Sequence, residues 1–245
     1  MRRVLLAALS LAALVGLWAF AASRTDDLLL ASPGQTWGAF TDNRSLLLDN
    51  AWVTLQEVLL GLLVAVVLGA LAAFAMHRSH VVRDATYPLL VASQAIPIVV
   101  LAPLFILAFD YGMGPKIAIV ALICFFPFTV NLLDGLRSLD PDVLKLMRSM
   151  GASRGRMLRL AEFPAALPGA FSGLRIAATV SVIGAVFGEW AGADKGLGRL
   201  VLIDNNQLET ARTYAGVVLL ALMAVALFTL VTLAERIAIP WRNTP

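Results

Sequence analysis

Residues 52–76 read WVTLQEVLLGLLVAVVLGALAAFAM, and this stretch decides the class of fold. Glu57 is its only charged residue. A helix needs about 20 apolar residues to cross the hydrocarbon core of a bilayer, and it satisfies its backbone hydrogen bonds internally where water is absent. The stretch therefore predicts a transmembrane helix.

Five more stretches have the same character, so the sequence predicts an all-α integral membrane protein with six transmembrane helices. The predicted spans cover residues 4–22, 52–76, 87–109, 116–133, 171–190 and 214–234. Pro88, Pro97 and Pro103 lie in the third span and predict a kinked or broken helix. The start of the chain also resembles a signal peptide, but its apolar stretch exceeds the usual length, and we expect it to be retained.

The composition of the 245 residues agrees with a membrane protein and excludes several other classes. Hydrophobic residues make up 60%, charged residues 14%, and the mean hydropathy is +0.84, whereas soluble proteins average about 25% charged residues. A soluble enzyme, a disordered tail and a coiled coil are excluded. No basic patch is interleaved with aromatic residues, so we expect no nucleic-acid partner. Cys124 is the only cysteine, and it is predicted to be a small core residue.

The distribution of Lys and Arg predicts the orientation in the membrane. One set of connections carries 12 of these residues and the other carries 6. Cytoplasmic connections carry the excess of positive charge. Both termini and residues 134–170 are therefore predicted to be cytoplasmic, in a multi-pass protein of the cell (inner) membrane.

The connection 134–170 is long for a compact membrane protein, and such connections are usually functional. Asp140 can cap a helix that begins at Pro141, and Gly151 can end it. A second short helix is predicted over 154–163, ended by Pro164.

The first of these helices is predicted to be amphipathic and to lie at the cytoplasmic surface. Val143, Leu146, Met147 and Met150 share one face at helical spacing, while Lys145 points elsewhere. This pattern favours a docking element, and the alternative is a helix that rests on lipid headgroups.

The same connection resembles the cytoplasmic signature of the permease subunits of ABC importers. That signature reads Glu-Ala-Ala, three residues, Gly, nine residues, Ile, one residue, Leu-Pro. Gly151 and Pro164 match its Gly and Pro at the same spacing, whereas residues 145–147, Ala161 and Phe163 depart from it. The resemblance extends through 54–61, 94–97, Pro103, 126–127, 151–154, 167–168 and 173–175. It is similar to the nitrate, sulfonate and taurine branch, which includes permeases for thiamine-precursor pyrimidines and riboflavin. Segments 188–190 and 233–241 look more like the latter two.

The resemblance implies a type I ABC importer permease that pairs with a second copy, two cytoplasmic ATPases and an extracytoplasmic solute-binding protein. The helix after Pro141 would be the coupling helix that contacts the ATPase. The residues implied in this contact are Leu146, Met147, Arg148, Met150, Gly151, Ala152, Arg154 and Pro164. The sequence has no G-x-x-x-x-G-K-[ST] loop for ATP phosphates, so we expect the chain to be no enzyme and to hold no cofactor, with ATP and Mg on the partner.

Polar residues inside the spans are candidates for a translocation path. The candidates are Ser93, Gln94, Thr129, Asn131, Thr179 and Ser181, with Pro97 as a helix break and Glu189 at the outer end. The alternative for the uncharged residues is hydrogen bonding between helices. The alternative for Glu189 is an interface residue that reaches water.

Four other features concern helix packing, the membrane surface and the connections. Glycines along 169–192 predict close helix packing, within the subunit or across a dimer. Arg175 is predicted to be a snorkelling anchor. Residues 191–213 are predicted to form a short re-entrant or docking segment, and the alternative is an ordinary solvated loop. His77 and His80 are predicted to be solvated loop residues, and no metal site is expected.

Two rival functions remain open on the sequence. A self-sufficient ion-coupled carrier would use Glu57, Asp134 or Glu189 as buried acids, although these lie towards the ends of spans. An intramembrane enzyme would need a clustered nucleophile, base or metal set, which the sequence does not offer.

Overall fold

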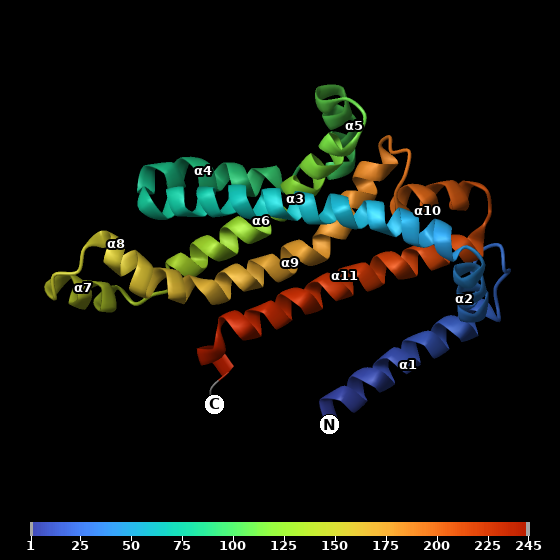
Figure 1. Cartoon of the computed structure of the whole chain (residues 1–245), viewed down its shortest axis with the longest axis horizontal. Coiled ribbons are helices and arrows are strands. Elements are labelled where there is room, and N and C mark those ends of the chain that lie inside the picture. Colours follow the sequence, from blue (N-terminus) through green and yellow to red (C-terminus); the bar gives the residue numbers. More distant parts are fainter. Residues whose placement is uncertain (1, 244–245) are drawn as a thin grey trace.

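The computed structural model describes residues 2–243, with all side chains of that range except those of residues 2–4, 7, 242 and 243. Over this range the chain is helical and has no strand (Figure 1). Its α-helices are α1 (Arg2–Ala22), α2 (Pro33–Asp42), α3 (Arg44–Arg78), α4 (His80–Ser93), α5 (Ile98–Phe109), α6 (Met113–Leu136), α7 (Pro141–Ser149), α8 (Arg154–Met157), α9 (Phe163–Trp190), α10 (Leu197–Asn206) and α11 (Thr210–Ala238). A π-helical turn, η1 (Leu158–Glu162), and a 3₁₀ turn, η2 (Pro240–Asn243), complete the fold.

Four helical stretches are long and apolar enough to cross a membrane: α3, α6, the run from α8 through α9, and α11. A fifth span results if α4 and α5 are counted as one bent unit. Helix α1 adds a shorter apolar stretch, Ala8–Ala22, within the described residues. The prediction of an all-α membrane fold is confirmed.

The third predicted span is broken, and the break lies at Pro97. Helices α4 and α5 meet at 105° across residues 94–97. Pro97 is the N-cap of α5 in an extended conformation, whereas Pro88 and Pro103 remain inside helices. A proline pushes the residue before it, here Ile96, out of the helical region, which agrees with the end of α4 at Ser93. The kink predicted from the prolines is confirmed.

Several predicted connections are helical. Only Ser79 separates α3 from α4, because its side chain accepts a hydrogen bond from the N–H of Val82 and caps α4 directly. The prediction that Pro164 ends a helix is wrong. The π-helical turn η1 precedes Pro164, and its wider hydrogen-bonding pattern lets the helix run on into α9 although proline has no N–H to donate. Residues 197–206 form α10 instead of an ordinary loop.

Helices α6 and α9 form the centre of the fold, and glycines on α9 let the two backbones approach closely. A Cβ added at Gly169 would lie 2.5 Å from the backbone oxygen of Asn131, and one added at Gly173 would lie 2.8 Å from that of Pro127. Gly184 and Gly188 contact Val120 and Lys116 of α6 in the same way. The close packing predicted from the glycines therefore occurs within the subunit.

This contact makes a testable prediction about stability. Gly169→Ala should lower the free energy of unfolding by about 1–3 kcal/mol, because the new methyl group meets backbone atoms that cannot rotate away. The measurement is thermal unfolding of the purified chain in detergent. Gly16→Ala is the matched control, since Gly16 lies in α1 with no atom within 4 Å of an added Cβ. Equal melting of both variants would contradict the close packing.

Candidate functional site

The two ends of helix α7 are set by capping residues that can be recognised in the sequence. The Asp140 side chain accepts a hydrogen bond from the N–H of Asp142, and Pro141 follows at the first helical position. At the other end Gly151 adopts a φ of +79°. The N–H of Gly151 donates to the oxygen of Arg148, and the N–H of Ala152 donates to that of Met147, both at 3.0 Å. This pattern is a Schellman cap, so the predicted start and end of the helix are confirmed.

The apolar face of α7 is uncovered. No residue of α7 is buried, and Val143, Leu146 and Met150 are 41%, 61% and 77% exposed. Figure 1 shows α7 and α8 projecting at one end of the molecule, beyond the ends of α3 and α6. We call Val143, Leu146, Met147 and Met150 the α7 surface. An apolar surface that the chain itself leaves open favours a partner.

The residues implied in ATPase contact fall into two groups. Six of them lie together on α7 and the turn after it, namely Leu146, Met147, Arg148, Met150, Gly151 and Ala152, and Arg154 begins α8 directly beyond. Pro164 lies apart, in the first turn of α9. Their role in coupling stays a prediction.

The base of this projecting segment is tied to α3. The Nε2 atom of His77 lies 3.1 Å from the Oε2 atom of Glu162 in η1, and both side chains are largely covered. The prediction of a solvated loop histidine is therefore wrong for His77, which belongs to the last turn of α3. This contact joins the α7–α8 segment to a membrane-crossing helix.

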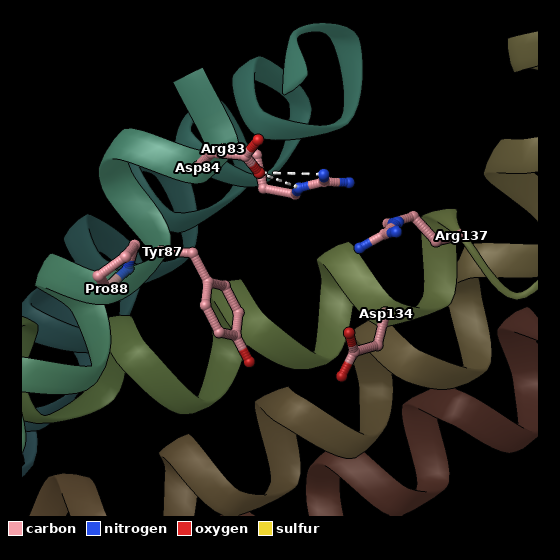
Figure 2. Close-up of a pocket in the computed structure, with 6 residues that line it drawn as sticks. All are labelled: Arg83, Asp84, Tyr87, Pro88, Asp134 and Arg137. Atoms are coloured by element: carbon pink, nitrogen blue, oxygen red, sulfur yellow. Dashed lines mark hydrogen bonds and ion pairs between the residues drawn. The ribbon is translucent and has the colours of Figure 1, made fainter. Parts of the chain in front are cut away.

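A cavity of about 320 Å³ opens beside this end of the bundle, between α4 and α6. Its lining residues are Arg83, Asp84, Tyr87, Pro88, Asp134 and Arg137. Figure 2 shows Arg83 and Arg137 extending into the same space from the two helices, with Arg83 bound to its neighbour Asp84 at 3.0 Å. Asp134, which the rival function would use as a buried acid, is exposed.

The predicted path residues do not gather at one place in the single chain. Thr129 and Ser181 are fully buried, and their hydroxyls donate to Phe125 and Ala178 of their own helices. The Asn131 side chain donates to the oxygen of Pro127 at 2.7 Å. By contrast, Gln94 and Pro97 are exposed at the break between α4 and α5. Their role in translocation stays a prediction.

A buried polar cluster at the opposite end holds three charged residues. Lys116 of α6 donates to Glu57 of α3 at 2.6 Å, and the other oxygen of Glu57 has no hydrogen-bond partner among the described residues. Glu189 of α9 is fully buried and interacts electrostatically with Glu57. The alternative in which Glu189 reaches water is wrong. We call Glu57, Lys116, Glu189 and Thr54 the Glu57 cluster.

Sequence reasoning missed most of this cluster, although one signal was available. Asn50, Thr54 and Glu57 follow one another at helical spacing, so they share one face of α3. Lys116 is the first residue of the predicted span 116–133, and it is only 8% exposed.

The partner of Arg175 was also missed. Its guanidinium donates to Glu235 of α11 at 2.6 Å and to Ser172 at 3.0 Å. Arg175 therefore ties α9 to α11 in addition to any anchoring at the membrane surface.

Membrane-crossing helices arranged around a close α6–α9 pair, with one amphipathic helix left uncovered, define a multi-pass membrane protein with a surface open to a partner. The chain belongs to the family described as binding-protein-dependent transport system inner membrane component, which matches residues 65–243. It is the permease component of an ABC transport system, and the family predicted from the sequence is confirmed.

Individual relatives support this assignment. The chain is 38% identical to the formylaminopyrimidine transport permease protein of Halalkalibacterium halodurans, over 88% of this chain and 86% of that protein. It is 37% identical to the riboflavin transport system permease protein of Chloroflexus aurantiacus, over 65% and 59%. Its fold is similar to that of the MetNI methionine ABC transporter in an inward-facing conformation, with a TM-score of 0.66, 18% identity, and coverage of 82% of this chain and 98% of that one.

Proposed function

We propose that two copies of this chain form the membrane channel of an ATP-driven importer. Each copy would dock a cytoplasmic ATPase through the α7 surface and receive solute from an extracytoplasmic binding protein. The observation that carries this proposal is the α7 surface itself, an apolar face that remains exposed on a stably capped helix at one end of the bundle. ATP and Mg would be bound by the partner, which would carry out hydrolysis.

The solute is proposed to be a small, flat nitrogen heterocycle of the pyrimidine or flavin kind. This proposal is supported by the names of two relatives, a formylaminopyrimidine permease and a riboflavin permease. The cavity between α4 and α6 offers an aromatic ring, two guanidinium groups and two carboxylates, which can stack on such a ring and exchange hydrogen bonds with it.

We further propose that α7 and both termini lie in the cytoplasm. Basic residues concentrate where α7 projects, at Arg78, Arg83, Arg137, Lys145, Arg148, Arg154, Arg156 and Arg159. An excess of Lys and Arg marks the cytoplasmic side of a membrane protein.

The rival function, an ion-coupled carrier, is not supported. Such carriers bury ionisable residues that are free to bind and release the coupling ion. Asp134 is exposed, one oxygen of Glu57 is bound by Lys116, and both oxygens of Glu189 accept hydrogen bonds. Membership in the binding-protein-dependent family also favours the importer.

The proposal predicts what accompanies the chain and what drives transport. A C-terminally tagged chain, extracted gently from its own membranes, should carry a P-loop ATPase in about one-to-one ratio, detectable by mass spectrometry. Liposomes containing this complex should take up the heterocycle only when binding protein and ATP are both supplied. Uptake by the chain alone without ATP would overturn the proposal.

A further inference from the structure

Helix α10 is fixed at its first turn by residues from two other helices. The Thr54 hydroxyl of α3 accepts a hydrogen bond from the N–H of Leu197 at 2.8 Å and donates one to Glu189 of α9 at 2.6 Å. The other oxygen of Glu189 accepts a hydrogen bond from the N–H of Arg199 at 3.0 Å. One hydroxyl and one carboxylate therefore satisfy two N–H groups that a helix start leaves without partners.

The charge of Glu189 suits this position. Backbone dipoles give the start of a helix a partial positive charge, which stabilises a nearby carboxylate. Gly196 and Gly198 leave the room that the carboxylate needs, because a Cβ at either position would overlap the Glu189 side chain. Gly196 also has a φ of +134°, which only glycine adopts readily, and its N–H donates to the Asn50 side chain at 2.8 Å.

The far end of α10 is fixed to another helix. Asp204 near its C-terminus accepts two hydrogen bonds from Arg212 of α11, at 2.7 and 2.8 Å. The helix thus spans from the α3–α9 pair to α11, at the end of the molecule opposite α7 (Figure 1).

A cavity of about 460 Å³ lies against α10, and α3 forms its other wall. Asp49, Asn50 and Val53 line it from α3, and Arg199, Leu200 and Ile203 line it from α10. The hydrogen bonds of Thr54 and Glu189 join these two walls beside the cavity, since Val53 precedes Thr54 and the N–H of Arg199 is the donor to Glu189. We therefore expect a change in this connection to alter the spacing of the two walls.

We infer that Thr54 and Glu189 are positioning residues of the transport cycle, which lock α10 to α3 and α9 so that the outer cavity opens and closes with those two helices. The role in transport rests on the proposed function, because it requires that this cavity faces the side from which solute would be delivered. The locking itself is a property of the single chain.

Thr54→Val tests the inference with little change in shape, because valine matches threonine in size but has no hydroxyl. Backbone amides of Leu197, Gly198 and Arg199 should exchange hydrogen at least tenfold faster, because opening of the first turn becomes easier. In the complex with ATPase and binding protein, the stimulation of ATP hydrolysis by loaded binding protein should fall at least fivefold. Thr54→Ser should restore both properties.

Thr36→Val is the matched control. Thr36 is buried in α2, and its hydroxyl donates to the backbone oxygen of Ser32, the N-cap of the same helix, so neither the exchange rates at α10 nor the stimulation should change. If Thr54→Val fails to fold, Glu189→Gln removes the charge at nearly constant shape and should give the same faster exchange.

Three outcomes would contradict different parts of the inference. If the variant that folds exchanges hydrogen at the wild-type rate, Thr54 and Glu189 do not hold α10 in place. Faster exchange with full stimulation would overturn their role in transport. If binding protein does not stimulate ATP hydrolysis in the wild-type complex, the proposed function is wrong. The exchange measurement would still show whether Thr54 and Glu189 hold α10 in place.

Discussion

Replacing Lys116 by methionine is expected to lower the free energy of unfolding by about 3–5 kcal/mol, because it removes one partner of a buried ion pair and leaves the other charge unpaired. Glu57 is fully buried, and its distance to the Lys116 ammonium is 2.6 Å. The effect should be large here because Glu189, a second carboxylate, interacts with Glu57 in the same cluster. Without Lys116 the described part of the cluster holds two acids and no cation.

The double variant Lys116→Met with Glu57→Leu separates loss of charge balance from loss of packing. A buried ion pair can often be replaced by apolar residues of similar size at little or no loss of stability. The double variant should therefore recover most of the stability that the single variant loses. The measurement is the fraction of folded, monodisperse protein after heating in detergent.

Lys195→Met is the control for a lysine outside the cluster. Lys195 is exposed in the turn before α10, so this change should alter stability by less than about 0.5 kcal/mol. If Lys116→Met melts at the wild-type temperature, the ion pair does not form in the membrane protein.

The parts of the fold that the sequence predicted are those governed by local rules. The length of the apolar stretch was enough to predict α3 and α11, and a proline was enough to predict the break before α5. The capping residues Asp140 and Gly151 were enough to predict α7. Each of these rules acts over a few residues. The same kind of rule could have shown that Ser79 begins a new helix, because serine is a strong N-cap residue.

The Glu57 cluster could not be predicted in this way, because its partners lie far apart in the chain. Glu57 and Lys116 are separated by 59 positions, and Thr54 and Glu189 by 135. A polar residue in a transmembrane helix signals that some partner exists, but it does not identify that partner. The glycines of α9 likewise predicted that another helix approaches closely, but a small residue does not identify which helix that is.

Helix α10 was missed for a different reason. Its glycines and polar residues indicated a loop, although Leu197, Leu200 and Val201 share one face at helical spacing. Ten residues of mixed composition form a stable helix here because both ends are held by side chains of other helices, Thr54 and Glu189 at the start and Arg212 near the end.

Gly151→Asp should abolish ATP-dependent uptake and the recovery of ATPase with the tagged chain, while the protein still reaches the membrane. Gly151 ends α7 next to the α7 surface, and an added Cβ would have no atom within 4 Å, so the folded chain itself has room for a side chain. A carboxylate at this place would be buried on docking inside the proposed apolar contact. An unpaired buried charge costs several kcal/mol, and about 3 kcal/mol already weakens association roughly a hundredfold.

Two variants distinguish charge from the other effects of this substitution. Gly151→Asn has nearly the same size and tolerates the positive φ at Gly151, so it should retain clearly more ATPase than Gly151→Asp. Gly34→Asp places the same charge in open space at the exposed start of α2, and uptake should be unchanged. Normal uptake by Gly151→Asp would show that α7 does not carry the contact, because no docked surface built on this turn could accept an added carboxylate without loss of affinity.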